Sequence, residues 1–335
     1  GVVMFIVLLQ NINPNLLLNF DNPRVSAKLG NTIYYSGYGL FLFYIGMILF
    51  WKEYVKAWKY FAIVAGFLGL LGIFLGGTRG TLLGLIFSVG VVIAGYFFCL
   101  KEHKKMRKAM SFLIIAGIVV FGLLFTFRHT NFVQKIPALG RLLSAPLTSG
   151  TGTTRIMAWE IAIEAWKERP VFGWGPNNYY YAFNKFYRPQ FLENGWGETW
   201  FDNAHSAIFN TLATQGTAGA LLYFGLFAVV FVQLWGSYRK GAVDTHLFCL
   251  GGAFLVGHFI HNAVVFENPT SYLYFFFFLA LINSQASNCK LPIANDKEKN
   301  REGGSVSSAL SVMVGTLVLF LIYYNFLHIQ NIFYF

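Results

Sequence analysis

Long apolar stretches alternate with short polar stretches along most of the 335 residues. Apolar runs of about 18–20 residues are long enough to cross the ~30 Å hydrocarbon core of a bilayer. A backbone that faces lipid must satisfy its own hydrogen bonds, so these runs must be helices. We expect an N-terminal partial span and about eight full spans, near residues 1–12, 33–51, 58–76, 80–100, 110–127, 207–235, 246–265, 271–287 and 308–327. The pattern predicts an all-α integral membrane protein, a polytopic helical bundle.

The composition agrees with this class. Hydrophobic residues make up 56% of the chain and charged residues only 12%, whereas a soluble domain carries roughly a quarter charged residues. The net charge of +11 would indicate nucleic acid as the partner of a soluble protein. Here the basic residues collect in short segments between the spans, so we expect a lipid bilayer and no nucleic acid as partner.

The basic segments also predict the orientation. Segment 101–108 holds five Lys or Arg residues, segment 52–59 three, segment 237–241 two and segment 288–304 four. All four fall on the same side of the predicted spans, which should be the cytoplasmic side. The long segment 128–205 then faces outward.

This topology divides the chain into five parts. We expect transmembrane helices over 1–127, a large extracytoplasmic loop over 128–205, further transmembrane helices over 206–287, a cytoplasmic loop over 288–307 and a last span within 308–335. The chain starts at Gly1, inside an apolar run and without the basic n-region of a signal peptide. We therefore expect that further spans precede residue 1.

Residues 154–169 predict an amphipathic helix within the large loop. Arg155, Trp159 and Trp166 share one face of this helix, and Pro170 ends it. A helix of this kind is expected at the membrane surface, with its tryptophans at the level of the lipid headgroups.

A tight turn and an aromatic segment follow this helix. Residues 171–178 are rich in Gly, Pro and Asn, which is typical of a turn. Residues 179–187 are aromatic with basic residues among them, a composition suited to sugar faces and phosphate. We expect the middle of the loop, from Trp174 to Trp200, to face an acceptor molecule.

Four residues at the outer ends of the predicted spans are candidates for chemistry: Arg24, Arg79, Arg155 and His205. A charge as close to the bilayer as Arg79 is costly unless it faces a cavity or a partner. Each also has a simpler interpretation. Arg79 could extend to the membrane surface, Arg155 could pack on Trp159, and His205 could be an ordinary interfacial residue.

Other kinds of site lack support in the sequence. The outer segments hold no Asp-x-Asp or Glu-x-x-His pair, so we expect no metal and no cofactor. Neither a Gly-x-Ser-x-Gly motif nor a phosphate-binding loop is present. His258 and His261 share a helix face near Glu267, which favours the lining of a polar cavity over a metal site. The three cysteines, at no metal spacing, indicate buried thiols: Cys99, Cys249 and Cys289.

Several short motifs together resemble the O-antigen ligase/polymerase superfamily of bacterial membrane glycosyltransferases. The resemblance covers residues 24 to 287 and depends on the order, spacing and common outward placement of the motifs. They are Arg24-Val-Ser-Ala-Lys-Leu-Gly30-Asn31, Thr78-Arg79-Gly80, Thr154-Arg155 with Trp159, Arg169-Pro170-Val-Phe-Gly173-Trp174-Gly175, Asp202-Asn203-Ala204-His205-Ser206, and Gly216-Thr-Ala-Gly219 with Tyr223.

The resemblance implies a function and roles for three residues. Members transfer a glycan from undecaprenyl diphosphate to an acceptor on the outer face of the bacterial cytoplasmic (inner) membrane, without a metal. Arg79 and Arg155 are then expected to bind the diphosphate, and His205 to act as the base. One departure is Ser206, since the family histidine is often followed by Asn. Secondary candidates are Arg24, Asp202, Asn203 and His261.

The acceptor stays open at this point. The favoured hypothesis is an O-antigen ligase of lipopolysaccharide biosynthesis, with lipid A core or another cell-envelope molecule as acceptor. A polymerase of repeat units and a protein O-oligosaccharyltransferase are the alternatives within the superfamily. A membrane transporter, which would carry charges in the middle of its spans, and a structural membrane protein are alternatives from other classes.

Overall fold

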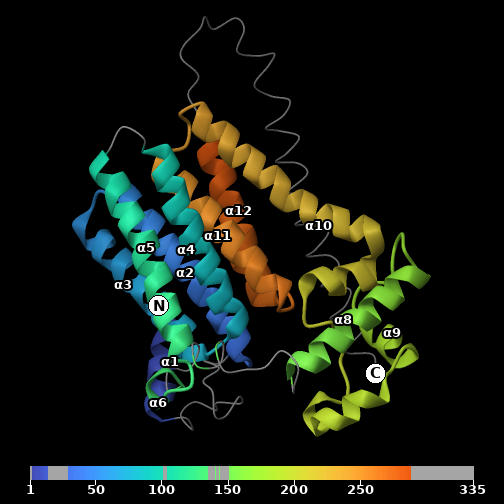
Figure 1. The fold of residues 1–335 in the computed structure, drawn as a ribbon. Coiled ribbons are helices and arrows are strands. Elements are labelled where there is room, and N and C mark those ends of the chain that lie inside the picture. The colour runs from blue at the N-terminus through green and yellow to red at the C-terminus, as the bar shows by residue number, and fades with distance from the viewer. Residues whose placement is uncertain are drawn as a thin grey trace, which may run out of the picture.

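The computed structural model describes residues 2–13, 29–100, 104–134, 140, 143 and 151–287. Every regular element within these ranges is a helix (Figure 1), which confirms the predicted all-α class. The elements are α1 (Val2–Ile12), α2 (Thr32–Lys52), α3 (Lys56–Gly76), α4 (Arg79–Cys99), α5 (Lys104–Thr126), α6 (Asn131–Gln134), α8 (Thr151–Glu168), α9 (Tyr179–Lys185), η1 (Pro189–Asn194), η2 (Trp196–Glu198), α10 (Ala207–Arg239), α11 (Thr245–Ala263) and α12 (Pro269–Ser287).

Five of the described helices are long and apolar enough to cross a membrane. They are α2, α3, α4, α5 from Arg107 onward, and α10. Helices α11 and α12 lie where two further spans were predicted, and each has 19 residues. The predicted total of about eight spans stays a prediction, and the predicted last span, 308–327, lies outside the described residues.

The two ends of the bundle differ in chemistry. At one end, Lys52 of α2 forms an ion pair of 3.1 Å with Asp244, and Trp51 stacks on His246 of α11 at 4.0 Å. This end carries the basic segments 52–59 and 237–241. The opposite end holds the α3–α4 turn, the α11–α12 connection and the start of α10. The described residues thus place the predicted chemistry at the end away from these basic segments.

Glycines let the helices of the bundle approach one another closely. A Cβ at Gly39 of α2 would lie 2.7 Å from the carbonyl oxygen of Gly69 in α3, and one at Gly84 of α4 would lie 2.5 Å from that of Gly257 in α11. Small residues at crossings are typical of membrane helices, since lipid provides no hydrophobic force to hold the helices together. Backbone contact therefore fixes how α4 and α11 sit side by side.

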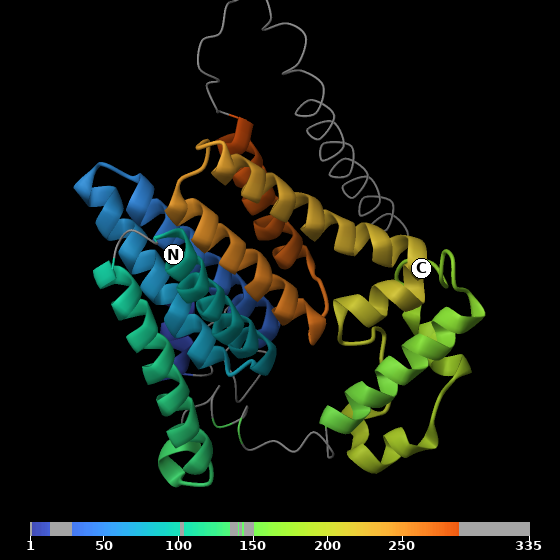
Figure 2. The same cartoon turned by 45° about the horizontal axis from the view of Figure 1, so that its top comes forward.

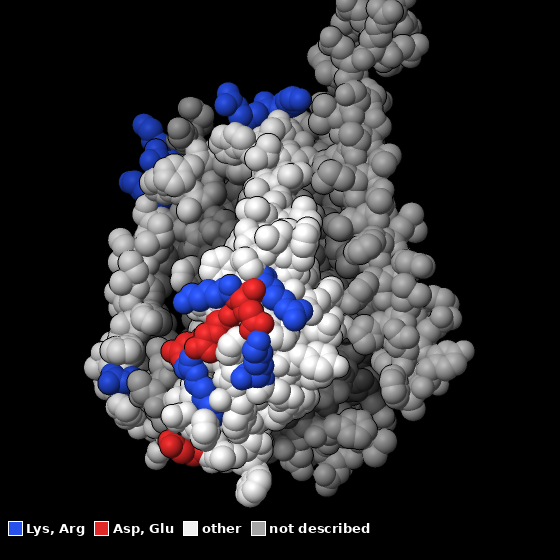
Figure 3. Space-filling view, turned by 90° about the vertical axis from the view of Figure 1, so that its right-hand side faces the viewer, with Lys and Arg blue, Asp and Glu red and all other residues white. Residues whose placement is uncertain are grey.

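Helices α8 and α9 form a separate layer beside the bundle (Figures 1 and 2). Helix α10 begins next to this layer and runs to the basic end of the bundle. The layer has its own apolar core, in which Ile161, Phe183 and Phe191 are fully buried. On its surface, carboxylates of α8 pair with basic residues at and beyond α9 (Figure 3). The pairs are Glu160 and Glu164 with Arg188, and Glu168 with Lys185.

The structure confirms the predicted loop helix as α8 but not the expected environment of its tryptophans. The indole of Trp159 stacks on Phe209 of α10 at 5.0 Å, and that of Trp166 donates to the Thr217 hydroxyl at 3.0 Å. Both indoles therefore contact α10 rather than pointing away from the protein to lipid headgroups. The reason is that the turn after α8 ties this helix to α10.

The turn after α8, around residues 170–175, packs against a kink in α10. Gly216 interrupts the helix with φ 67° and ψ −164°, and Gly173 in the turn also has a φ of +67°. The backbones of the turn and the kink exchange hydrogen bonds: Trp174 N to Ala213 O at 3.0 Å, Gly175 N to Thr214 O at 2.8 Å, Thr217 N to Pro170 O at 2.8 Å and Ala218 N to Val171 O at 3.1 Å. The turn thus supplies the partners that the kink removes from the helix.

Replacement of either glycine by alanine should destabilise the protein strongly. A Cβ at Gly173 would lie 2.5 Å from the backbone of Thr214, and one at Gly216 would lie 2.3 Å from that of Val171. Positive φ adds strain for any L side chain, so we expect each variant to lose roughly 3 kcal/mol of stability. Thermal unfolding of the purified protein in detergent measures this loss.

The matched control is Gly225→Ala, in the same helix. No atom lies within 4 Å of a Cβ at this position, and alanine favours a helix, so this variant should melt at or slightly above the parent temperature. Unchanged melting of Gly173→Ala and Gly216→Ala would contradict the backbone contact.

Candidate active site

A short non-helical segment between α11 and α12, Val264–Phe266, lies where the elements that carry Arg79, Arg155 and His205 meet. Its carbonyl groups and side chains contact the start of α4, the first turns of α8 and the start of α10. The amide of Ala207, the first residue of α10, donates to the carbonyl of Val265 at 2.8 Å. Three elements distant in sequence are thereby assembled around one stretch of backbone.

Arg79 is the first residue of α4, directly after a turn in which Gly77 has a φ of +58°. The neighbouring Gly80 packs on the segment, because a Cβ there would lie 2.9 Å from side-chain atoms of both Val264 and Val265. The Nε of Arg79 is buried and has no hydrogen-bond partner among the described residues. A buried donor of this kind is costly unless a partner such as an anion takes it up.

Arg155 lies in the second turn of α8 and reaches the same segment. One of its Nη atoms donates to the carbonyl oxygen of Val264 at 3.3 Å. The preceding residue, Thr154, is buried and donates to the carboxylate of Glu198 at 2.8 Å, which fastens the start of α8 to η2. Arg155 is therefore held with its guanidinium at the α11–α12 connection.

His205 stands just before α10, between two aromatic rings. Phe201 and Phe266 meet the imidazole edge-to-face, with ring centroids at 4.9 and 5.2 Å. Its φ of +51° is unusual for a residue other than glycine. The side chain of Asn203 supports this conformation, because its Oδ1 accepts the amide of His205 at 2.8 Å. Ser206 then caps α10 by accepting the amide of Phe209.

The hydrogen bond of the imidazole sets its tautomer. Nδ1 of His205 lies 3.3 Å from the carbonyl oxygen of Asn203. A carbonyl oxygen only accepts, so Nδ1 carries the proton and Nε2 keeps its lone pair. His205 is thereby arranged to accept a proton at Nε2.

Burial and the nearby positive charge of Arg155 lower the pKa of His205 below its ordinary value of 6.5. The carbonyl of Asn203 and the carboxylates of Asp202 and Glu198 act in the opposite direction but do not reverse the shift. His205 is therefore neutral at pH 7, the form in which it can act as a base. Arg155 and His205 both contact the same short segment, since Arg155 donates to Val264 and His205 meets the ring of Phe266.

The secondary candidates take different places. Asp202 is exposed and accepts the side-chain amide of Asn203 at 2.7 Å, so both support the turn that carries His205. Arg24 lies outside the described residues. His261 is fully buried in α11, where its Nδ1 lies 3.0 Å from the Thr81 hydroxyl of α4. It thus links two helices directly behind the segment.

No group of three or more His, Cys, Asp or Glu side chains in the described ranges is placed to hold a metal. His258 and Glu267 do approach each other, with 3.6 Å between Nε2 and Oε1, but within a buried hydrogen-bond network of Asn262 and Ser271. The predicted independence from metal stays a prediction.

Sequence reasoning missed the Val264–Phe266 segment itself. Its residues continue the apolar run of the predicted span 246–265, so neither composition nor periodicity distinguishes them from the end of a helix. The signal that could have found it is the pair Glu267-Asn268 before Pro269, since Asn before Pro is typical of the start of a helix. This signal predicts an earlier end for the preceding helix than hydropathy predicts.

Comparison with known proteins bears on the predicted resemblance. Residues 64–224 match the model of the family described as O-antigen ligase. The matched region includes Arg79, Arg155 and His205, and this match confirms the predicted superfamily. The search of curated proteins found no match.

The charge of Arg155 leads to a prediction about His205. In the parent protein, we expect the imidazole to titrate below pH 6.5. In Arg155→Gln, the loss of the positive charge should raise the pKa of His205. NMR spectra of protein labelled at histidine measure this, with the His205 signal assigned from its loss in His205→Gln. The matched control, Arg239→Gln at the other end of α10, should leave the titration unchanged. Equal titration of His205 in the parent protein, Arg155→Gln and Arg239→Gln would contradict the proximity of Arg155 to His205.

Proposed function

Because this chain belongs to the O-antigen ligase superfamily, we propose that it transfers a glycan from undecaprenyl diphosphate to an acceptor on the outer face of the bacterial cytoplasmic membrane. The observation that carries the proposal is that Arg155 and a neutral His205 both contact Val264–Phe266, the segment on which Gly80, next to Arg79, also packs. Lipid A core is the favoured acceptor. Repeat units of the same glycan and a protein hydroxyl are the alternatives.

The two arginines suit the leaving group. Negative charge grows on the diphosphate as the bond to the anomeric carbon breaks, and guanidinium groups bind phosphate oxygens bidentately and stay charged at any relevant pH. The buried Nε of Arg79, which has no hydrogen-bond partner within the described ranges, supports this role. Two such donors at a partly dehydrated site would stabilise the developing charge without a metal.

His205 suits the other half of the reaction. Its Nε2 would take the proton of the acceptor hydroxyl while the acceptor oxygen bonds to the anomeric carbon and the diphosphate leaves with the bonding electron pair. One displacement of this kind inverts the anomeric configuration. The proton on His205 then passes to water, and the neutral imidazole is restored.

The distribution of charge argues against the transporter hypothesis. In the described helices that could span a membrane, Lys and Arg stand only near the ends, and Asp and Glu are absent. A transporter that moves ions or anions would carry charges at the middle of its spans. Polar groups gathered at one end of the bundle fit a reaction at the membrane surface better than passage through it.

Release of undecaprenyl diphosphate tests the proposal, because this product is the same for every acceptor. We expect the purified chain in proteoliposomes to release it from a lipid-linked glycan when lipid A core, a second lipid-linked glycan or a peptide is added. The acceptor that supports release identifies the branch of the superfamily. Arg79→Ala, Arg155→Ala and His205→Gln should each slow release about 10²–10⁴-fold.

Arg239→Ala, at the opposite end of α10, is the matched control and should release product at the parent rate. If all three site variants transfer glycan as fast as this control, the proposed site is not the place of the reaction. If the parent protein releases no product with any acceptor, the function is wrong.

The aromatic part of the outer layer is proposed to bind acceptor sugar. Tyr180 packs on Tyr181 at 4.2 Å and approaches Trp200 at 6.4 Å, and the Trp200 indole donates to Asn184 at 3.1 Å. More than half of the Tyr181 and Trp200 surfaces is exposed. Trp200 also precedes Phe201, whose ring meets His205. The exposed indole of Trp200 is therefore adjacent in the chain to the ring that contacts the proposed base.

Removal of these rings should weaken acceptor binding more than turnover. We expect Trp200→Ala and Tyr181→Ala to raise the KM for the acceptor roughly tenfold each, the loss of one stacking contact, with kcat changed less than threefold. Steady-state release of undecaprenyl diphosphate at varied acceptor concentration measures both constants. Trp58→Ala on α3, an equally exposed tryptophan, should leave both unchanged. An equal effect of all three variants would indicate membrane anchoring instead.

A further inference from the structure

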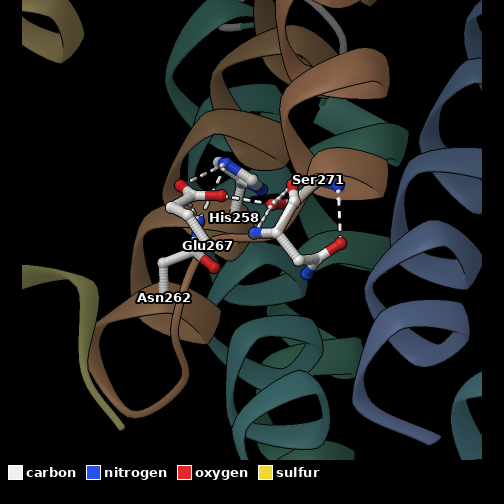
Figure 4. A network of polar contacts seen from close by, with 5 residues as sticks. His258, Asn262, Glu267 and Ser271 are labelled. Atoms are coloured by element: carbon white, nitrogen blue, oxygen red, sulfur yellow. Dashed lines mark hydrogen bonds and ion pairs between the residues drawn. The ribbon is translucent and has the colours of Figure 1, made fainter. Parts of the chain in front are cut away.

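The residues that flank the Val264–Phe266 segment form a buried polar network (Figure 4). The side-chain amide of Asn262, in the last turn of α11, donates to Oε1 of Glu267 at 2.6 Å and to Nε2 of His258 at 2.9 Å. The hydroxyl of Ser271 in α12 donates to Oε2 of the same carboxylate. Glu267 is thus the acceptor that joins the end of α11 to the start of α12.

His258 also contacts this network. Its Nε2 lies 2.9 Å from Nδ2 of Asn262 and 3.6 Å from Oε1 of Glu267. Asn262 Nδ2 has two hydrogens, so it can donate to Glu267 and to His258 at the same time. Side chains from both α11 and α12 therefore hold the carboxylate of Glu267.

A second set of hydrogen bonds anchors the far side of the network. Asn268 and Ser271 cap α12 reciprocally: Asn268 Oδ1 accepts the Ser271 amide at 3.0 Å, and Ser271 Oγ accepts the Asn268 amide at 2.8 Å. This is the arrangement of a capping box. Ser271 therefore fixes both the start of α12 and the carboxylate of Glu267.

The network holds both ends of the segment that assembles the site. Asn262 and Glu267 lie on either side of Val264–Phe266, so their hydrogen bond closes the loop between them. Within the loop, the Val264 carbonyl accepts Arg155, the Val265 carbonyl accepts the start of α10, and Phe266 meets His205. A shift of the loop would move all three contacts together.

We infer that Glu267 is a positioning residue for the transfer site: its carboxylate fixes the Val264–Phe266 segment and thereby the distance between Arg155 and His205. The inference rests on the proposed function for its meaning in catalysis. Its structural content, the placement of Arg155 beside His205, can be measured without turnover. No role in contacting substrate is assigned to Glu267.

Glu267→Gln is the direct test, since glutamine keeps the shape but has only one oxygen. Either Asn262 or Ser271 then faces an amide donor and loses its acceptor. We expect the segment to loosen, His205 to gain water, and Arg155 to move away from it. Both changes raise the pKa of His205. Binding of farnesyl diphosphate, a short prenyl diphosphate used as probe, should weaken roughly tenfold, the loss of one charge-assisted hydrogen bond.

The direction of the His205 shift separates positioning from a direct effect of charge. His205 is faced by Arg155 from α8 and by Asp202 and Glu198 from the preceding turns, and Glu267 by His258 from α11 and by tyrosines of α10 and α12. Removal of a nearby negative charge would lower the pKa of His205, whereas a loosened segment raises it. Ser271→Ala keeps the charge of Glu267 and removes one donor, so it should raise the pKa in the same direction by a smaller amount.

The matched control is Asp244→Asn, the same carboxylate-to-amide change at the opposite end of α11. It removes the ion pair with Lys52 and should lower the melting temperature without changing His205 titration or farnesyl diphosphate binding. The inference is overturned if Glu267→Gln and Ser271→Ala behave like Asp244→Asn, with lower stability alone, or if they lower the pKa of His205. Failure of the parent protein to release undecaprenyl diphosphate would overturn the proposed function but not this measurement.

Discussion

Hydrogen bonding of the Val264–Phe266 backbone is the constraint on which the end of the bundle away from the basic segments depends. A non-helical stretch at the end of a membrane helix pair exposes carbonyl groups that need donors. Arg155 and the first amide of α10 supply donors to Val264 and Val265. A need of the backbone thus draws two distant parts of the chain to one place, together with the start of α4, where Gly80 packs on the same segment.

The charges around His205 oppose one another, and its imidazole remains neutral. Burial and Arg155 keep the pKa of His205 low, while Asp202 and Glu198 limit the shift. A diphosphate bound to the arginines would offset the positive charge beside the imidazole. The base would then become stronger when the leaving group is in place, which ties proton removal to the presence of donor.

The parts of this fold that lipid dictates could be predicted, and the parts that depend on tertiary contact could not. Hydropathy placed α2 and α4 because their whole surface is apolar, and the ends of the predicted spans indicated Arg79, Arg155 and His205 as candidates for the site. The periodicity of α8 identified a buried face but not the element that covers it, so Trp159 and Trp166 were assigned to lipid instead of α10. Gly216 gave no sign of a kink, since glycine in an apolar span also serves helix packing.

The backbone contact between Gly173 and Gly216 has a consequence for how such proteins diversify. A turn that closes on a kink through main-chain atoms alone accepts almost any side chain around it but no exchange of either glycine. Turn and kink must therefore be inherited as a pair. A segment that is exchanged between relatives and carries the exposed surface near Tyr181 and Trp200 keeps the join intact if it includes both glycines, whereas a single crossover between residues 173 and 216 would require both parents to share this join.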